Sequence, residues 1–135
     1  MWQLAHLASG ALVGQQASVP VIAFGLGVGA HFLIDKIPHY WPWPISERHW
    51  FTAVDYLITI PVFYFSLKYF QTNQIGIIWG ALGSLSVDAL LVGVPWLHHS
   101  KLGKWHHDRQ PHHRKPIYLI TDAVVIVLSL LFLAK

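Results

Sequence analysis

The chain has 135 residues, enough for one domain, and 54% of them are hydrophobic whereas only 11% are charged. The absence of cysteine excludes disulfides and thiolate metal sites. A net charge of +3 and a mean hydropathy of +0.45 are typical of a membrane protein whose basic residues set its orientation, and they argue against a nucleic-acid partner.

Five apolar segments follow one another along the chain, and we expect each to form a helix. They cover residues 4–14, 20–37, 47–69, 75–97 and 116–134. A membrane span needs about 20 apolar residues, so the last three segments qualify, the second nearly does, and the first is expected to be tilted or half-inserted. The predicted fold is an all-α integral membrane protein, a single-domain bundle of about five transmembrane or near-spanning helices.

Small residues indicate which helices meet. Gly10 and Gly14 lie four residues apart in the first segment, as do Gly25 and Gly29 in the second. Because glycines at this spacing let two helix backbones approach closely, we expect the first two helices to form a tight hairpin, with Gly10 near Gly25 or Gly29. No signal peptide is expected, because the N-terminal end lacks a basic region and His6 interrupts its apolar run.

Basic residues set the orientation of these helices. Lys36 and Arg48 flank the connection between the second and third segments. Five more gather between the fourth and fifth segments: Lys101, Lys104, Arg109, Arg114 and Lys115. The positive-inside rule places both connections in the cytoplasm, which with five spans puts the N-terminus inside and the C-terminus outside.

A histidine and an aspartate share one face of the second helix. His31 and Asp35 lie four residues apart, a usual way for a helix to present two ligands to a metal ion. In the predicted topology, ionisable residues of the other helices fall at a similar depth, within roughly 5–14 Å of the cytoplasmic face. Carboxylates and imidazoles in one layer repel unless they are protonated or bind cations. We therefore predict a site for one or two divalent ions, Zn, Mn or Mg, with the ligands His6, His31, Asp35, His39 and Asp88.

Other polar residues are assigned supporting roles. A general base is expected from Asp55, His106 or His107. An anionic head group is expected to meet Arg109, His112, His113, Arg114 and Lys115, while Thr52, Thr59 and Asp122 are expected to support the site by hydrogen bonding. Plainer interpretations stay open: His6 as a hydrogen-bonded core residue, Asp55 and Asp122 as caps or partners of basic residues, and the paired histidines of the last connection as a solvated patch.

The order of these motifs resembles that of a known family. An early histidine with small residues after it (Ala5 to Gly10) is followed by the block from Gly29 to His39, by a later acid in a small-residue helix (Gly80 to Asp88), and by a histidine-rich connection. This order is similar to that of small membrane-bound metal-dependent hydrolases of bacteria, the YdjM-like proteins. The resemblance implies metal-dependent hydrolysis in a bacterial cytoplasmic membrane.

Two functions of different classes account for the buried polar layer. The first is a hydrolase of a phosphoester or ester, acting on a lipid or another amphiphile at the cytoplasmic interface. The alternative is a non-catalytic membrane subunit that binds haem or chlorophyll through His6 and His31 within a larger complex. A third, an ion or proton pathway, is poorly supported by a layer confined to one half of the membrane. A homo-oligomer is left open.

Overall fold

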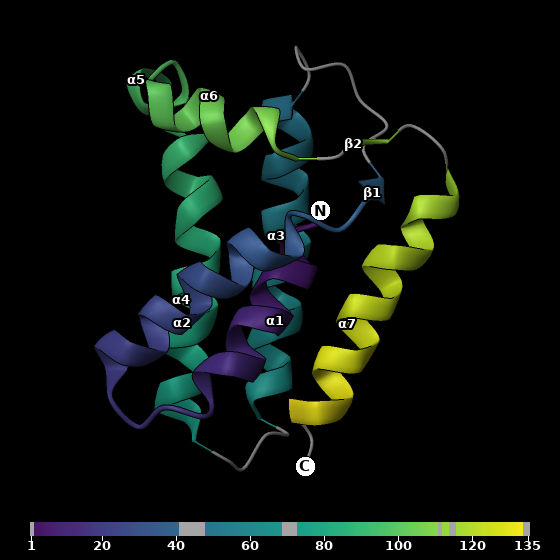
Figure 1. The fold of residues 1–135 in the computed structure, drawn as a ribbon. Coiled ribbons are helices and arrows are strands. Elements are labelled where there is room, and N and C mark those ends of the chain that lie inside the picture. Colours follow the sequence, from purple (N-terminus) through teal and green to yellow (C-terminus); the bar gives the residue numbers. More distant parts are fainter. Residues whose placement is uncertain (1, 41–47, 69–72, 111, 114–115, 134–135) are drawn as a thin grey trace.

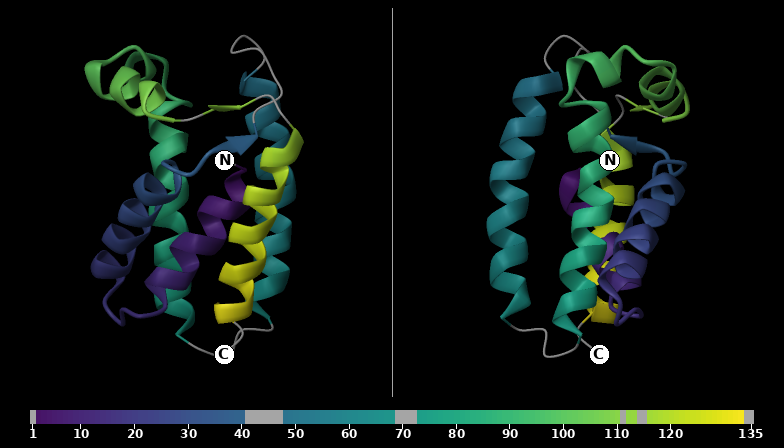
Figure 2. Two further views of the ribbon diagram at one scale, coloured as in Figure 1. Left: turned by 45° about the vertical axis from the view of Figure 1, so that its right-hand side comes forward. Right: turned by 90° about the vertical axis from the view of Figure 1, so that its left-hand side faces the viewer.

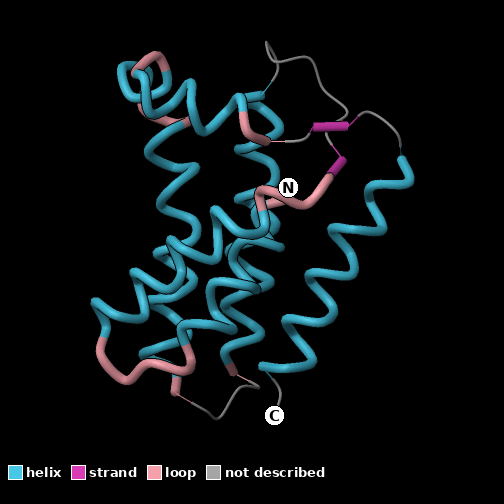
Figure 3. The backbone as a smooth tube through the Cα atoms, in the orientation of Figure 1, coloured by secondary structure: helices cyan, strands magenta, loops and turns pink. Residues whose placement is uncertain are grey.

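The computed structural model describes residues 2–40, 48–68, 73–110, 112–113 and 116–133. Helices make up most of this part of the chain (Figure 3), so the all-helical class predicted from the sequence is confirmed. The elements in chain order are α1 (Gln3–Gly14), α2 (Pro20–Ile34), β1 (His39–Tyr40), α3 (Arg48–Leu67), α4 (Gln74–Leu91), α5 (Pro95–His98), α6 (Lys101–Asp108), β2 (His112–His113), the 3₁₀ turn η2 (Pro116–Tyr118) and α7 (Leu119–Leu133).

Helix α4 is the centre against which α1 and α2 pack, and glycines bring the three backbones together. A Cβ added to Gly10 of α1 would lie 2.6 Å from the carbonyl oxygen of Gly80 in α4. One added to Gly27 of α2 would overlap that same oxygen, and one added to Gly80 would overlap the carbonyl oxygen of Gly10. Helices this close can be built only from residues without side chains at the crossing.

The expected pairing of Gly10 with Gly25 or Gly29 is wrong. A Cβ added to either Gly25 or Gly29 would meet nothing within 4 Å, whereas Gly10 abuts α4. The reason is helical phase. Gly27 precedes His31 by four residues and so shares the face that packs on α4, and Gly25 and Gly29 point elsewhere.

The connection after α4 contains more structure than its sequence predicted. Helix α4 ends at Leu91 rather than at residue 97, because Gly93 and Pro95 interrupt it. Ser100 then caps α6, its Oγ accepting a hydrogen bond from the backbone N–H of Gly103 at 3.1 Å. Helix α6 lies across the end of the bundle, at the same end at which α3 and α7 begin (Figures 1 and 2).

A two-residue parallel pairing joins the two connections at this end. His39 of β1 is opposite His112 of β2, and Tyr40 is opposite His113. The segment after α2 is thereby tied to the segment after α6. This pairing and α6 place residues from both basic connections around one end of the bundle (Figure 1).

Fewer helices are long enough to cross a membrane than the sequence predicted. Within the described residues, Gln74–Leu91 alone is both long and apolar enough to do so, and Pro20–Ile34, Ala53–Phe65 and Leu119–Leu133 are apolar but shorter. Helix α1 has 12 residues and spans only about 18 Å. It begins near the level of β1 and of the first turn of α7, whereas α3 begins closer to the end of the bundle (Figures 1 and 2).

Candidate metal centre

Three imidazoles and two carboxylates from four elements meet in the interior. They are His6 of α1, His31 of α2, Asp35 at the C-terminal end of α2, Asp88 of α4 and His106 of α6, and all five are buried. His6, His31 and Asp88 form one set whose candidate ligand atoms lie within 4.8 Å of one another. His31, Asp35 and His106 form a second such set, so His31 belongs to both.

Small residues next to these side chains explain why they meet. Gly10 follows His6 by one helical turn, and Gly27 precedes His31 by one turn. Both glycines abut Gly80 of α4, which lies two turns before Asp88 on the same face. The close approach of the three backbones therefore brings the imidazoles and the carboxylate one or two turns further along into contact.

The distances between the converging atoms match the spacing of ligands around a small cation. The Nε2 atoms of His6 and His31 lie 3.3 and 3.1 Å from the two carboxylate oxygens of Asp35. Oδ1 of Asp88 is 3.2 Å from Nε2 of His106 and 3.7 Å from Nε2 of His31. Ligands of a tetrahedral ion with bonds of about 2.0–2.2 Å stand about 3.3–3.6 Å apart. The cluster therefore has the dimensions of a site that could hold a metal ion.

The unpaired atoms of the cluster point to the same conclusion. Within the described residues, neither nitrogen of His6, neither nitrogen of His31, nor Oδ1 of Asp35 makes a hydrogen bond, although all are buried. Leaving a buried polar group unpaired costs about 1–3 kcal/mol. A divalent cation placed among these facing nitrogens and oxygens would satisfy both kinds of atom at once.

Two glutamines hold the carboxylates in place. The Nε2 amide of Gln3 donates to Oδ2 of Asp88 at 2.8 Å, and that of Gln110 donates to Oδ2 of Asp35 at 2.9 Å. Gln110 Nε2 also lies 3.0 Å from Nε2 of His106. Hydrogen bonds of this kind orient metal ligands. The sequence analysis did not assign a role to either glutamine. Gln3 lies three residues before His6, and Gln110 lies four residues after His106. This helical spacing from a candidate histidine was the signal that could have identified them.

The other predicted aspartates lie beside the cluster rather than in it. Oδ2 of Asp55 accepts the backbone N–H of Gln3 at 2.6 Å, and Thr59 donates to Oδ1 at 3.2 Å. Asp55 thus caps the N-terminus of α1, a helix whose own N-cap residue supplies no side-chain bond. Asp122 accepts the backbone N–H of Tyr40 at 3.5 Å. Asp55 thus makes the capping contact that the sequence left open, whereas Asp122 contacts the backbone of β1.

The remaining predicted residues lie in four places. His39 is buried outside both sets; its Nδ1 lies 3.0 Å from the carbonyl oxygen of Ile37, and burial lowers the pKa of its imidazole to about 4. Half-buried His107 lies on α6 and does not line the pocket at Asp35. The backbones of His112 and His113 form β2. Outside the described part of the chain lie Arg114, Lys115 and the side chains of Thr52, His112 and His113.

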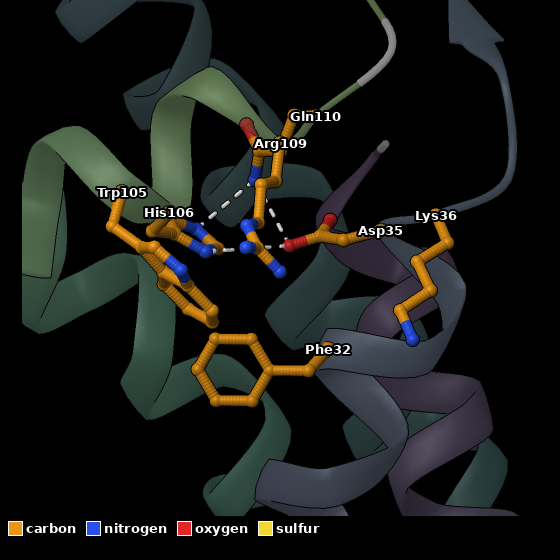
Figure 4. Close-up of a pocket in the computed structure, with 7 residues that line it drawn as sticks. All are labelled: Phe32, Asp35, Lys36, Trp105, His106, Arg109 and Gln110. Carbon is orange, nitrogen blue, oxygen red and sulfur yellow. Dashed lines mark hydrogen bonds and ion pairs between the residues drawn. The ribbon is translucent and has the colours of Figure 1, made fainter.

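A pocket of about 170 Å³ opens onto the cluster between α2 and α6 (Figure 4). Asp35 and His106 point toward each other across it, and Phe32 and Trp105 form an apolar side, with ring centres 5.9 Å apart. Its remaining lining residues are Lys36, Arg109 and Gln110. The guanidinium of Arg109 rests on the ring of Trp105, 4.8 Å from its centre. The opening is therefore both cationic and aromatic.

Comparison with known proteins does not add to this description, because no family model, curated protein or solved structure matches the chain. The resemblance of its motifs to bacterial membrane hydrolases therefore stays a prediction.

Proposed function

We propose that the chain is an integral membrane, metal-dependent hydrolase that cleaves a phosphoester or ester of an anionic amphiphile near the cytoplasmic interface. The observation that carries the proposal is the convergence of His6, His31, Asp35, Asp88 and His106, all buried, behind a pocket flanked by Lys36 and Arg109. Three imidazoles and two carboxylates suit Zn²⁺ or Mn²⁺ well, and Mg²⁺ less well because it prefers oxygen ligands.

The distribution of polar and apolar side chains supports a location in the membrane. Polar residues are buried in the interior, whereas large apolar side chains on α2, α3, α4 and α7 face outward. Val21 and Leu57 are both 74% exposed and Leu33 is 65% exposed. Soluble monomers rarely expose large contiguous apolar patches, because each costs free energy in water. A polar interior inside an apolar surface is the arrangement that a bilayer favours.

The residues of the site divide the chemistry among them. A bound divalent cation would lower the pKa of a water ligand to about 7 and polarise the ester group. In such a hydrolysis the water oxygen would bond to the phosphorus or acyl carbon, the bond to the leaving oxygen would break, and that oxygen would take up the proton that the water loses. Gln3 and Gln110 keep the two carboxylates oriented, and Arg109 and Lys36 hold the anionic group.

The size and position of the pocket support an amphiphilic substrate. Its volume of about 170 Å³ is smaller than the roughly 300–1,000 Å³ of sites that enclose a whole ligand, so it can take in only a head group. Phe32 and Trp105 provide an apolar wall for the first part of a chain. The rest of the substrate would remain in the bilayer against the outer surface of the helices.

The geometry is unfavourable for haem or chlorophyll. A macrocycle needs open space in front of the axial nitrogen, but the Nε2 atoms of His6 and His31 face carboxylate oxygens at 3.3 and 3.1 Å. The two imidazoles also stack directly on each other, with ring centres 4.0 Å apart. A visible absorption band in the purified protein would contradict this interpretation.

An activity assay tests the proposal. The detergent-solubilised full chain, stripped with chelator, is given Zn²⁺, Mn²⁺ or Mg²⁺ together with phosphomonoesters, phosphodiesters and carboxyl esters that carry an acyl chain. We expect metal-dependent hydrolysis of at least one anionic amphiphile, lost in His31→Ala and in Asp88→Asn, which keeps the side-chain size, and kept in Lys104→Ala on the same helix as His106. The absence of hydrolysis across this panel, or metal-independent hydrolysis, would contradict the proposal.

A further inference from the structure

The imidazole rings of His6 and His31 are stacked, an arrangement that disfavours the binding of both rings to one metal ion. Their centres are 4.0 Å apart and their planes differ by only 20°. An imidazole binds a metal along the lone pair of its nitrogen, which lies in the ring plane, at about 2.0–2.1 Å. The planes of two nearly parallel stacked rings intersect only at a distance from the nitrogens that is much longer than a metal–nitrogen bond. The lone pairs of the two rings therefore point to two separate positions.

Asp35 faces both of those positions. Its Oδ1 lies 3.3 Å from Nε2 of His6, and its Oδ2 lies 3.1 Å from Nε2 of His31. Each oxygen of one carboxylate is thus paired with a different imidazole. This is how a carboxylate that bridges two metal ions is disposed, because each of its oxygens binds one of them.

Asp88 and His106 lie beside these positions. Oδ2 of Asp35 is 3.7 Å from Nδ1 of His106, and Oδ1 of Asp88 is 3.2 Å from Nε2 of the same ring. Asp88 also belongs to the set that contains His6 and His31.

We propose that the cluster binds two divalent cations, bridged by Asp35, with His6 on one ion and His31 and His106 on the other. This rests on the metal-binding part of the function proposed above and extends it. Two divalent ions carry four positive charges and the two carboxylates balance two of them. The remaining positive charge would attract an anionic substrate, so a pair of ions would favour a phosphoester over a carboxyl ester.

Manganese tests the number of ions without any activity measurement. The chelator-stripped full chain in detergent is titrated with Mn²⁺ by equilibrium dialysis, and the bound ions are examined by electron paramagnetic resonance. We expect two Mn²⁺ per chain and a spin-coupled spectrum. His6→Ala should bind one Mn²⁺ and show the six-line spectrum of an isolated ion, whereas His99→Ala, an exposed histidine outside both sets, should behave as wild type.

A single Mn²⁺ in wild type, or a His6→Ala variant that still binds two coupled ions, overturns the two-ion inference. Because His6 lies at a helix crossing, His6→Gln serves as a second variant that keeps most of the side-chain volume. One bound ion together with hydrolysis would leave the proposed function intact, and two coupled ions without hydrolysis would support the inference alone. No bound Mn²⁺ contradicts both metal proposals.

Discussion

The Nε2 atom of His6 on α1 lies 3.3 Å from Oδ1 of Asp35, which ends α2. The same carboxylate accepts a hydrogen bond from Gln110 at 2.9 Å, just beyond α6. One side chain therefore connects the short N-terminal helix, the helix that follows it and the helix that covers the end of the bundle. A metal ion at this carboxylate would hold three elements together, so the site and the stability of the fold are linked.

The crossing of α1 and α2 over α4 predicts a contrast between two glycines. Leucine at Gly80 would overlap the carbonyl oxygen of Gly10 and lie against the backbone of Gly14, whereas leucine at Gly25 would meet nothing within 4 Å. Overpacking of a tight core costs about 1–3 kcal/mol or more. We expect Gly80→Leu to melt well below wild type in detergent and Gly25→Leu to melt close to it. Equal melting temperatures would mean that the crossing is not this close.

The contacts of Asp55 predict a structural effect without a metal effect. Asp55→Ala removes the acceptor of the Gln3 N–H at the start of α1. We expect a loss of about 0.5–2 kcal/mol in the free energy of unfolding, typical of a lost helix cap, with metal content unchanged. Thermal melting and metal analysis of the same sample measure both. Unchanged stability combined with lost hydrolysis would instead make Asp55 the general base.

The cationic side of the pocket predicts a selective effect on anionic substrates. Arg109 lines the pocket that contains Asp35 and His106, whereas exposed Lys104 lies on the same helix and does not line it. Arg109→Ala should raise KM for an anionic amphiphile roughly fivefold, or about 1 kcal/mol, with a smaller effect at high salt. It should leave a neutral ester unaffected. A similar rise in Lys104→Ala would point to a general effect of surface charge.

The proposed membrane location, with the basic connections in the cytoplasm, predicts which end of the bundle is accessible from outside the cell. The chain has no native cysteine, so a single introduced one reports its own position. Lys104 lies on α6, and exposed Gln16 lies in the turn between α1 and α2 at the other end of the bundle (Figure 2). In intact cells a membrane-impermeant maleimide should label Gln16→Cys and not Lys104→Cys. Labelling of Lys104→Cys alone would show that the orientation is opposite to the predicted one.

The spacing of residues along the sequence was sufficient to predict that several residues of the site lie close together. His31 and Asp35 share a helical face because they lie four residues apart, independently of the rest of the fold. The predicted directions of the helices placed His6 and Asp88 at a similar depth from the cytoplasmic face. The structure brings these four together, with His106 among the candidate ligands rather than as a separate base. His106 was harder to place, because the apolar period that marks a helix is missing from a short, polar, Ser-capped element such as α6.

Other features could not be read from the sequence because they depend on which surfaces meet. The spacing of Gly25 and Gly29 shows that a close contact is possible, but not that α2 uses Gly27 for it instead. Gln3 and Gln110 carry no charge, so neither stands out in an apolar chain, and their function appears only with Asp88 and Asp35 opposite them. Asp55 caps a helix distant in sequence, which local patterns do not encode.

Metal analysis of the purified protein, with melting before and after chelation, tests the central claim most directly. Wild type should contain a stoichiometric divalent metal, and chelator should lower its melting temperature, because a ligand present at 100 times its Kd stabilises a fold by about 2.7 kcal/mol. Asp88→Asn and His31→Ala, taken from the monodisperse fraction, should contain less metal than wild type, and chelator should change their melting temperatures less. A wild-type protein that contains no metal and does not respond to chelator or to added Zn²⁺ or Mn²⁺ would contradict the account.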